Sequence, residues 1–461
     1  MIDPAIDPAS ASGMEWNDSF QEAQEWIESG CRCLFVTGKA GTGKTTLLTH
    51  LKRKVLNKAV VLAPTGVAAV HVGGQTIHSF FRFPPHVLFP ETVARLGGGR
   101  IYRKLSTLII DEISMVRADI IDAIDQFLRM HGPEANEPFG GVQMIFFGDL
   151  HQLPPVVSPH EGEAFGSLYE SPWFFKARVF NQLPFDKVEL RKVYRQKEQS
   201  FLALLNAIRT GEAEAEDLDA LNTRAEKPAD PLARPMGLAR QAEAAENAEP
   251  EAPVITLTST NAAADRVNGR MLENLSAPLA LFKSQVAGDF DARIFPTDEP
   301  LGLKVGAQVM LLKNHPQGMW VNGTLGTVAA MEPDWIWVDI PGLVKGANLD
   351  PEAGPLGAVR VERAMWESVR YSLDAETGKP TPRPVGRFTQ FPLKLAWAMT
   401  IHKSQGKTFD RVIIDLGNGA FAHGQSYVAL SRCRTLEGIT LKRPLQSKDL
   451  VLDPEVREFM A

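Results

Sequence analysis

The segment GKAGTGKT, which begins at Gly38, has the glycine and lysine spacing of a loop that binds phosphate groups. Gly38, Gly41 and Gly43 let the backbone turn its N–H groups toward phosphate oxygens. Lys44 places a positive charge at the outer phosphates, and the hydroxyl of Thr45 suits a magnesium ion. The apolar run CLFVT precedes the segment and the helical pattern TTLLTHLKRKVL follows it. The sequence therefore predicts a site for ATP and Mg²⁺ between a strand and a helix.

Two further strand ends carry groups suited to phosphoryl transfer. LIIDEIS delivers Asp111, which can join the magnesium shell, and Glu112, which can orient or deprotonate the attacking water. GDLHQLPP follows the run VQMIFF, and its Gln152 is placed to sense the γ-phosphate. A DE pair alone is more often a solvated strand end, and two prolines can simply hold a turn. The phosphate loop upstream favours the functional interpretation of both segments.

Arg195 in VYRQ and Arg432 in ALSRCR are candidate arginine fingers. Arginine suits this role because it is always charged and presents a rigid fork to phosphate oxygens. An isolated arginine more often forms a surface salt bridge, so the assignment depends on the patterns in which these two residues occur.

The elements that position these groups follow from six short apolar runs. Several of the runs end in Gly, Asp, Thr or Ser, which is typical of buried parallel strands. The runs are CLFVTG, AVVLAPTG, LSTLIIDE, VQMIFFGD, VITLTST and RVIIDL. Four of them precede residue 150 and two follow residue 250. This spacing predicts an α/β protein with two sheets and a boundary near residue 200.

Two stretches interrupt this pattern. Residues 211–253 are rich in Ala, Glu and Pro, which predicts a solvated, low-complexity insertion. Residues 301–390 carry β-like runs separated by Gly and Pro, which predicts a small β-barrel-like domain inserted into the second α/β unit. The first unit is then residues 1–200, and the second comprises 201–300 and 391–461.

Composition limits the classes of protein to consider. A chain of 461 residues, 44% of them hydrophobic, is long enough for two to four domains. No apolar run reaches the roughly 18 residues of a membrane span, and the three cysteines match neither a disulfide set nor a zinc pattern, so we expect a cytoplasmic protein. The net charge of −6 does not exclude nucleic acid, because residues 390–450 carry nine basic and four acidic side chains.

Eight segments, in order, resemble the motif series of superfamily-1B helicases, most closely the Pif-type (petite integration frequency) branch related to RecD. They are GKAGTGKT, APTGVAA, GQTIHSFF, LIIDEISMV, PFGGVQMIFFGDLHQLPPV, VYRQ, TIHKSQGKTFD and YVALSRCRT. MVRADIIDAIDQFLR and FLALLNAIRTGE also fit this branch. The resemblance covers nearly the whole chain. It implies two RecA-like P-loop domains with ATP between them, a small wedge insertion at about 79–104 in the first and the β-rich insertion in the second.

The activity that this resemblance implies is ATP-driven 5′-to-3′ movement along single-stranded DNA with unwinding of duplexes and forks. We expect a monomeric motor that serves DNA repair, recombination or genome maintenance, including telomere maintenance. Nothing in the residues themselves separates DNA from RNA, because a group that reads the 2′-OH has no recognisable pattern.

The resemblance also assigns roles residue by residue. Nucleotide, magnesium and hydrolysis roles fall on Gln21, Gly38, Ala40, Gly41, Thr42, Gly43, Lys44, Thr45, Thr46, Asp111, Glu112, Gln152, Arg195, Gln405, Gly406 and Arg432. DNA contacts fall on Pro64, Thr65, His78, Thr400, His402 and Lys403. Gln21 and Gln24 compete as the glutamine that reads adenine. Phe80, Phe81, Phe83, Phe89 and Trp397 are candidates for base stacking, although such aromatics are more often buried in a core.

Three other interpretations share parts of this pattern. A nucleotide-dependent clamp or switch that binds DNA without moving would use the same motifs. The helicase part of a conjugative relaxase would need a nuclease domain with clustered His and a catalytic Tyr, whereas the chain has ten His and five Tyr, scattered along it. A small-molecule kinase leaves a second α/β unit with its own arginine unexplained. The motor remains the main hypothesis.

Overall fold

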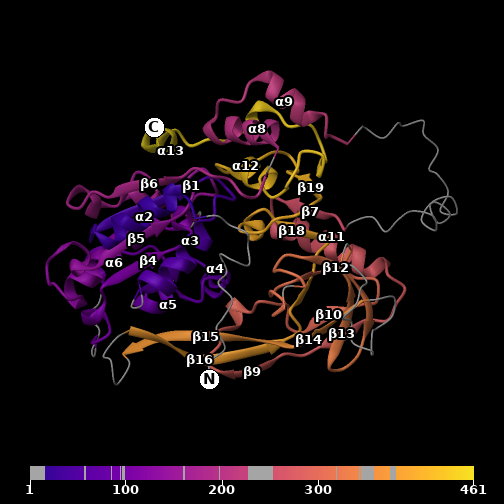
Figure 1. Cartoon of the computed structure of the whole chain (residues 1–461), viewed down its shortest axis with the longest axis horizontal. Helices are drawn as coiled ribbons and strands as arrows, with labels where there is room; N and C mark the ends of the chain where they lie inside the picture. Colours follow the sequence, from indigo (N-terminus) through magenta and orange to yellow (C-terminus); the bar gives the residue numbers. More distant parts are fainter. Residues whose placement is uncertain are drawn as a thin grey trace.

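The computed structural model contains two parallel sheets and a β-rich region, shown in Figure 1. It describes residues 16–56, 59–84, 86–93, 95, 99–158, 161–196, 198–226, 253–317, 319–341, 343, 358–373 and 380–460. Six predicted strands are confirmed, because each apolar run named above contains a buried parallel strand.

The first sheet has six parallel strands in the order β3-β2-β4-β5-β1-β6. Its strands are β1 (Cys33–Gly38), β2 (Val60–Ala63), β3 (Gln75–Thr76), β4 (Thr107–Ile110), β5 (Gln143–Phe147) and β6 (Asp186–Leu190). Successive side chains of β1 enter two different apolar clusters, Phe35 in one and Leu34 and Val36 in the other, because strand side chains alternate between faces. Both faces are therefore buried, which explains the uniformly apolar runs.

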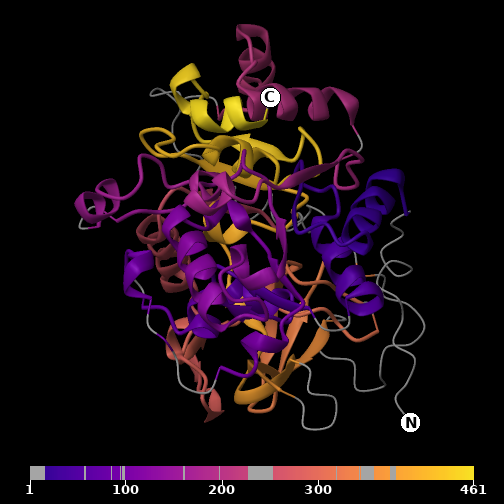
Figure 2. The ribbon, with the colours of Figure 1, turned by 90° about the vertical axis from the view of Figure 1, so that its left-hand side faces the viewer.

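Helices cover both faces of this sheet. They include α2 (Asp18–Glu28), α3 (Lys44–His50), α4 (Gly66–His71), α5 (Ile77–Phe81) and α6 (Ala118–His131), and α3 continues as a π-helical turn, Leu51–Val55. Figure 2 shows this unit from its own side, with the orange β-rich strands below it and the yellow C-terminal part above.

The second sheet has four parallel strands in the order β18-β7-β19-β20. They are β7 (Ile255–Thr258), β18 (Ala398–Thr400), β19 (Val412–Asp415) and β20 (Ile439–Leu441). Helices α8 (Gln199–Thr210), α11 (Asn261–Asn274) and α12 (Gln425–Leu430) flank it. The buried side chains of α8 and α12 share one apolar cluster with these strands, so α8 packs with the second sheet directly after the VYRQ segment.

The β-rich region is wider than predicted. Its antiparallel five-stranded sheet contains β11 (Gln308–Leu311), β12 (Leu325–Met331), β13 (Trp335–Asp339), β14 (Val359–Glu362) and β17 (Leu393–Leu395). Smaller sheets join β8 (Ala280–Phe282) to β10 (Leu301–Leu303), and β9 (Gln285–Gly288) to β15 (Ala364–Leu373) and β16 (Pro380–Gln390). The predicted limits 301–390 are therefore wrong at both ends, because β8 and β9 precede residue 301 and β17 follows residue 390. Strand β8 has only three residues and β9 is exposed along its whole length, so neither has the pattern of a buried strand.

Two segments reach back to the first sheet. The β15–β16 hairpin runs beneath it (Figure 1), where the Tyr371 hydroxyl accepts a hydrogen bond from the backbone N–H of Val61 at 3.2 Å. The C-terminal helix α13 (Pro454–Met460) buries Val456 in the first core and stacks Phe459 on Phe175 with ring centroids 4.1 Å apart. The prediction that all of 391–461 belongs to the second unit is thus wrong for α13.

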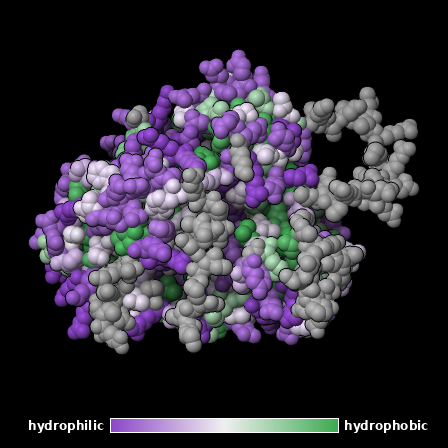
Figure 3. All heavy atoms as spheres, viewed as in Figure 1, coloured by the Kyte–Doolittle hydropathy of each residue, from purple (hydrophilic) through white to green (hydrophobic). Residues whose placement is uncertain are grey.

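The low-complexity insertion also begins later than predicted. Residues Ala215–Asn222 form helix α9, which starts with a capping box between Glu214 and Asp217 and buries Leu221. The prediction of a low-complexity insertion from residue 211 is therefore wrong for the segment that contains α9. The later part of the predicted insertion, residues 227–252, lies outside the described residues. Within the part of the chain that the structure describes, no helix is both long and apolar enough to cross a membrane. Figure 3 shows one face of the molecule, which is covered mainly by hydrophilic side chains.

Candidate nucleotide site between the two sheets

The phosphate loop lies between β1 and α3, as its spacing predicted. Gly41 and Gly43 have φ values of 82° and 86°, a conformation that residues with a Cβ rarely adopt. A Cβ on Gly41 would also lie 2.5 Å from Cβ of Arg195, so glycine allows the loop to pack against the VYRQ segment. The Lys44 ammonium donates hydrogen bonds to the carbonyl oxygens of Gly38 and Lys39 at 2.6 and 3.1 Å. The lysine is therefore held within the loop.

The rest of the loop and the first turn of α3 hold the remaining predicted nucleotide residues. Thr42 is buried and donates its hydroxyl to the Lys39 carbonyl, whereas Thr45 and Thr46 in α3 are partly exposed. The Ala40 side chain is also buried, with 6% of its surface exposed.

Asp111 and Glu112 follow β4 next to the loop. Burial and the negative charge of Glu112 together raise the pKa of Asp111 to about 7. Burial also raises the pKa of Glu112, although the charges of Lys44 and Arg432 oppose this. The nearby cations of the protein therefore do not offset the effect of burial on the two carboxylates. The Asp111 carboxylate and the Thr45 hydroxyl supply oxygen atoms, the ligand type that magnesium prefers, and Glu112 is left for the attacking water.

Gln152 connects the two sheets, and it is almost completely buried. Its side-chain amide donates to Asp149 Oδ2 at 3.2 Å, and its Oε1 accepts from Gln405 Nε2 at 3.3 Å. Gln405 lies in the segment after β18 and precedes Gly406, whose φ is 75°. The structure therefore joins the two predicted glutamines directly.

The two candidate arginine fingers both contact Ser431, Arg432 fully buried and Arg195 partly buried. Arg195 Nη1 donates to the Ser431 carbonyl at 3.1 Å, and Arg432 Nε and Nη2 donate to the Val428 carbonyl and the Ser431 hydroxyl at 2.9 and 2.7 Å. Burial lowers the pKa of Arg195 to about 9, with help from the charge of Arg432, whose own pKa burial lowers to about 10. No carboxylate of the described residues forms an ion pair with either guanidinium. An anion between them would relieve the mutual repulsion.

Sequence reasoning missed three residues of this site, Asp149, Arg209 and Tyr427. Asp149 is fully buried, which by itself raises its pKa, but the charge of Arg209, a hydrogen bond from His151 and the charge of Lys44 hold the pKa well below its usual range. All three residues lie inside segments that carry the resemblance, GDLHQLPP, NAIRTG and YVALSR. The available signal was an aspartate directly after a fully apolar strand, where a buried charge needs a partner.

The two candidates for adenine recognition are equivalent in their contacts. Gln21 Nε2 donates to Glu25 Oε1 and Gln24 Nε2 donates to Glu28 Oε1, each at 2.8 Å along α2. The cap of this helix, Asn17, has a different role. Its Nδ2 donates to the Tyr194 hydroxyl at 2.8 Å, which ties α2 to the VYRQ segment beside the phosphate loop.

The predicted DNA contacts fall into two groups, one on each sheet. Pro64 and Thr65 follow β2, and the Thr65 hydroxyl caps α4, while His78 lies in α5. Thr400 ends β18, and its hydroxyl accepts a hydrogen bond from the N–H of Lys403 at 3.3 Å. The structure brings Thr400, His402 and Lys403 into one turn and leaves the first group on the other sheet.

The prediction that Phe80, Phe81 and Phe83 could stack on DNA bases is wrong. All three are buried in the first core, where Phe81 stacks on Phe83 at 5.2 Å between ring centroids. Their apolar surface is used for packing, so no ring face is left for a base. Phe89 is 36% exposed and remains a candidate, whereas Trp397 packs partly against the β-rich core.

This fold and site define a P-loop nucleotide-binding protein with two RecA-like sheets that share one phosphate site. A PIF1-like helicase family model matches residues 16–219, and a model of the DNA helicase Pif1 2B domain matches residues 290–331. Pif1 from Bacteroides sp. in complex with ADP-AlF4 is 36% identical, with a TM-score of 0.82 over 97% of this chain and 96% of that chain. The same Bacteroides protein bound to ssDNA superposes with a TM-score of 0.66.

Two curated relatives extend the comparison. The ATP-dependent DNA helicase Pif1 of Bdellovibrio bacteriovorus is 31% identical over 449 residues, which cover 92% of this chain and 87% of the relative. The human ATP-dependent DNA helicase PIF1 is 34% identical over 445 residues, 93% of this chain, but the match covers 61% of the human protein. The chain thus spans less than two thirds of the length of its vertebrate relatives. The chain belongs to the Pif1-like helicase family.

Proposed function

We propose that this chain is an ATP-hydrolysing DNA helicase that moves 5′ to 3′ on single-stranded DNA and unwinds duplexes and forks as a monomer. The observation that carries the proposal is the contact of Arg195 and Arg432 with Ser431, which caps α12 of the second unit. Neither arginine has a carboxylate partner among the described residues, and Arg195 packs against Gly41 of the phosphate loop. A nucleotide bound there would be contacted from both units. The relatives support DNA as the track, because Bacteroides Pif1 has been solved bound to ssDNA and the human and Bdellovibrio relatives are named DNA helicases.

Hydrolysis would use the site in the following way. Lys44 and the loop N–H groups would hold the outer phosphates, and Thr45 and Asp111 would hold magnesium, which would neutralise phosphate charge. Glu112 orients and deprotonates the attacking water, a role that suits its raised pKa. Arg195 and Arg432 stabilise charge on the transferred phosphoryl group. The Gln152–Gln405 contact reports the γ-phosphate to the second unit, and the change in contact between the units drives movement.

We expect binding to single-stranded DNA to depend on salt, because the positive charge of Lys403 would neutralise a phosphate. Thr400 and His402 beside it, and Pro64, Thr65 and His78 on the other sheet, would contact the backbone without adding charge. The logarithm of affinity should fall linearly with that of salt concentration, with a slope of about −0.7 per neutralised phosphate. Lys403→Ala should make the slope shallower by about 0.7. Fluorescence anisotropy with an oligo-dT strand measures this, and exposed Lys448 provides the matched Lys448→Ala control. Affinity that does not change with salt would rule out this groove.

A forked duplex distinguishes the motor from a clamp. We expect ATP-dependent strand displacement by the full chain, monitored by release of a quenched fluorescent strand. Glu112→Gln should bind ATP and DNA but displace no strand, since the base for water is lost. DNA-stimulated ATP hydrolysis without strand displacement in the wild-type protein would favour the clamp instead.

A further inference from the structure

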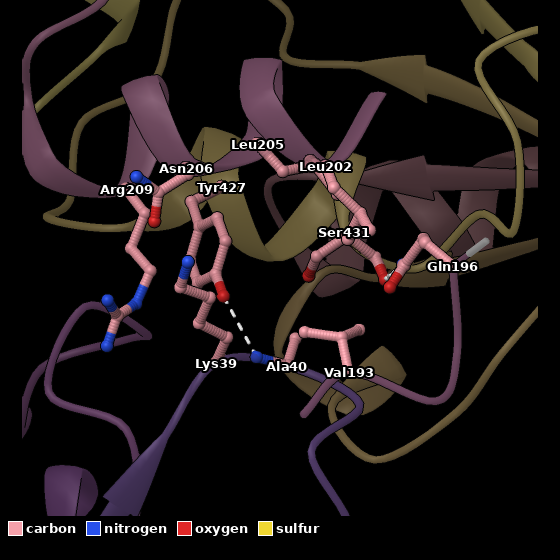
Figure 4. Close-up of a pocket in the computed structure, with 10 residues that line it drawn as sticks. All are labelled: Lys39, Ala40, Val193, Gln196, Leu202, Leu205, Asn206, Arg209, Tyr427 and Ser431. Carbon is pink, nitrogen blue, oxygen red and sulfur yellow. Dashed lines mark hydrogen bonds between the residues drawn. The ribbon is translucent and has the colours of Figure 1, made fainter. Parts of the chain in front are cut away.

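Helix α12 of the second unit touches both halves of the phosphate site. At its start, Gly424 leaves no space for a side chain, because a Cβ there would lie 2.2 Å from the His151 carbonyl oxygen and 2.7 Å from that of Gln152. One turn further, the Tyr427 hydroxyl accepts a hydrogen bond from the N–H of Ala40 in the phosphate loop at 2.9 Å, the dashed line in Figure 4. One short helix therefore contacts both the phosphate loop and the Gln152 segment.

A second contact comes from α8. Arg209 Nη2 donates to Asp149 Oδ1 at 3.4 Å, and both side chains are buried. The Tyr427 hydroxyl lies 3.4 Å from the other oxygen of the same carboxylate. Figure 4 shows Arg209 and Tyr427 extending from their helices toward the loop that holds Lys39 and Ala40. Asp149, which follows β5, is thus approached from two helices of the second unit.

Apolar packing supports the same connection. Ala40 of the phosphate loop and Leu153 of the Gln152 segment belong to the apolar cluster of the second sheet, not to the clusters of their own sheet. A cavity of about 10 Å³ remains between Ala40, Tyr427 and Arg209, room for about one water molecule. The phosphate loop is therefore embedded in the second unit through side chains as well as hydrogen bonds.

We propose that Tyr427 and Arg209 are positioning residues, through which the second unit holds the phosphate loop and the end of β5 in the arrangement that hydrolyses ATP. Neither residue needs to touch the nucleotide. The N–H of Ala40 and the carboxylate of Asp149 are buried and need partners, so the two units separate only if water or nucleotide replaces these bonds. Opening of the cleft and release of the phosphate loop are thereby linked. The inference rests on the proposed ATPase function.

Removing only the hydroxyl tests this link. Tyr427→Phe should lower the DNA-stimulated kcat for ATP hydrolysis about tenfold, while KM for ATP and the Kd for a fluorescent ATP analogue without DNA change less than about twofold. This split is expected because nucleotide binding depends mainly on the loop, whereas turnover needs the second unit in place. Arg209→Met should show the same split, and Arg209→Lys should recover part of the lost kcat because it keeps the charge on Asp149.

Tyr169→Phe is the matched control. The Tyr169 hydroxyl is also buried on a carboxylate, that of Asp122, but lies within the first unit. We expect it to lower Tm without the loss of kcat. A kcat for Tyr427→Phe within twofold of wild type, or a loss of kcat equal to that of Tyr169→Phe, would overturn the inference. A wild-type protein without DNA-stimulated ATP hydrolysis would overturn the proposed function itself, so the two failures are distinguishable.

Discussion

Lys44→Ala is expected to abolish ATP hydrolysis, with a loss of kcat on the order of 10³-fold or more. The Lys44 ammonium lies at the loop carbonyls of Gly38 and Lys39, and nucleotide binding would transfer it to the outer phosphates. Alanine removes the positive charge where negative charge develops in the transition state, inside a buried site where the effect of one charge is large. Steady-state ATP hydrolysis with saturating single-stranded DNA measures the loss.

The matched control is Lys54→Ala. Lys54 is exposed on the π-helical turn Leu51–Val55, which continues α3 at the end away from the phosphate loop. Its replacement should leave kcat within about twofold of wild type. Near-normal turnover of Lys44→Ala would contradict the assignment of the whole phosphate site.

Arg432→Ala is expected to lower the DNA-stimulated kcat by roughly 10³-fold, the effect of losing an arginine finger. Arg432 is 1% exposed, and its charge acts on Glu112, which lies on the other sheet. It is therefore a cation of the second unit held at the phosphate site of the first. ATP binding without DNA should change little, because the loop and Lys44 remain.

Stability must be measured with this variant, because the substitution removes two hydrogen bonds that the buried guanidinium donates, to the Val428 carbonyl and the Ser431 hydroxyl, and a hydrogen bond to a charged group contributes about 1.5–3 kcal/mol. Arg434→Ala is the control, since Arg434 lies two residues away but is exposed and paired with Asp410. Turnover by a folded Arg432→Ala protein equal to that of wild type would show that the second unit does not complete the site.

Local patterns predicted the part of the fold that depends on neighbouring residues. Six of the ten parallel strands in the two sheets were predictable because burial on both faces leaves an uninterrupted apolar run. The phosphate loop was predictable because its chemistry needs a fixed spacing. Strands β8 and β9 were not, because β8 has only three residues and β9 is exposed along its whole length. Helix α13 was misplaced because the apolar residues Val456 and Phe459 mark a buried face without saying which core receives it.

The contacts between the units were beyond local patterns. Asp149 and Tyr427 are 278 positions apart, and Asp149 and Arg209 are 60 positions apart, so only the folded chain brings them together. The prediction that aromatic residues after His78 stack on DNA bases was wrong for a related reason. The sequence around a phenylalanine does not show whether its ring faces a nucleic acid or the core. Most phenylalanines are buried, and these three are too.

Strand displacement from duplexes with a single tail tests the central claim, an ATP-driven motor that moves 5′ to 3′ along DNA, most directly. Two substrates share one duplex and differ only in carrying a 5′ or a 3′ single-stranded tail of equal length. We predict ATP-dependent unwinding of the 5′-tailed duplex and none of the 3′-tailed duplex. Unwinding only of the 3′-tailed duplex would contradict the direction, and unwinding of neither, with DNA-stimulated hydrolysis intact, would contradict the motor.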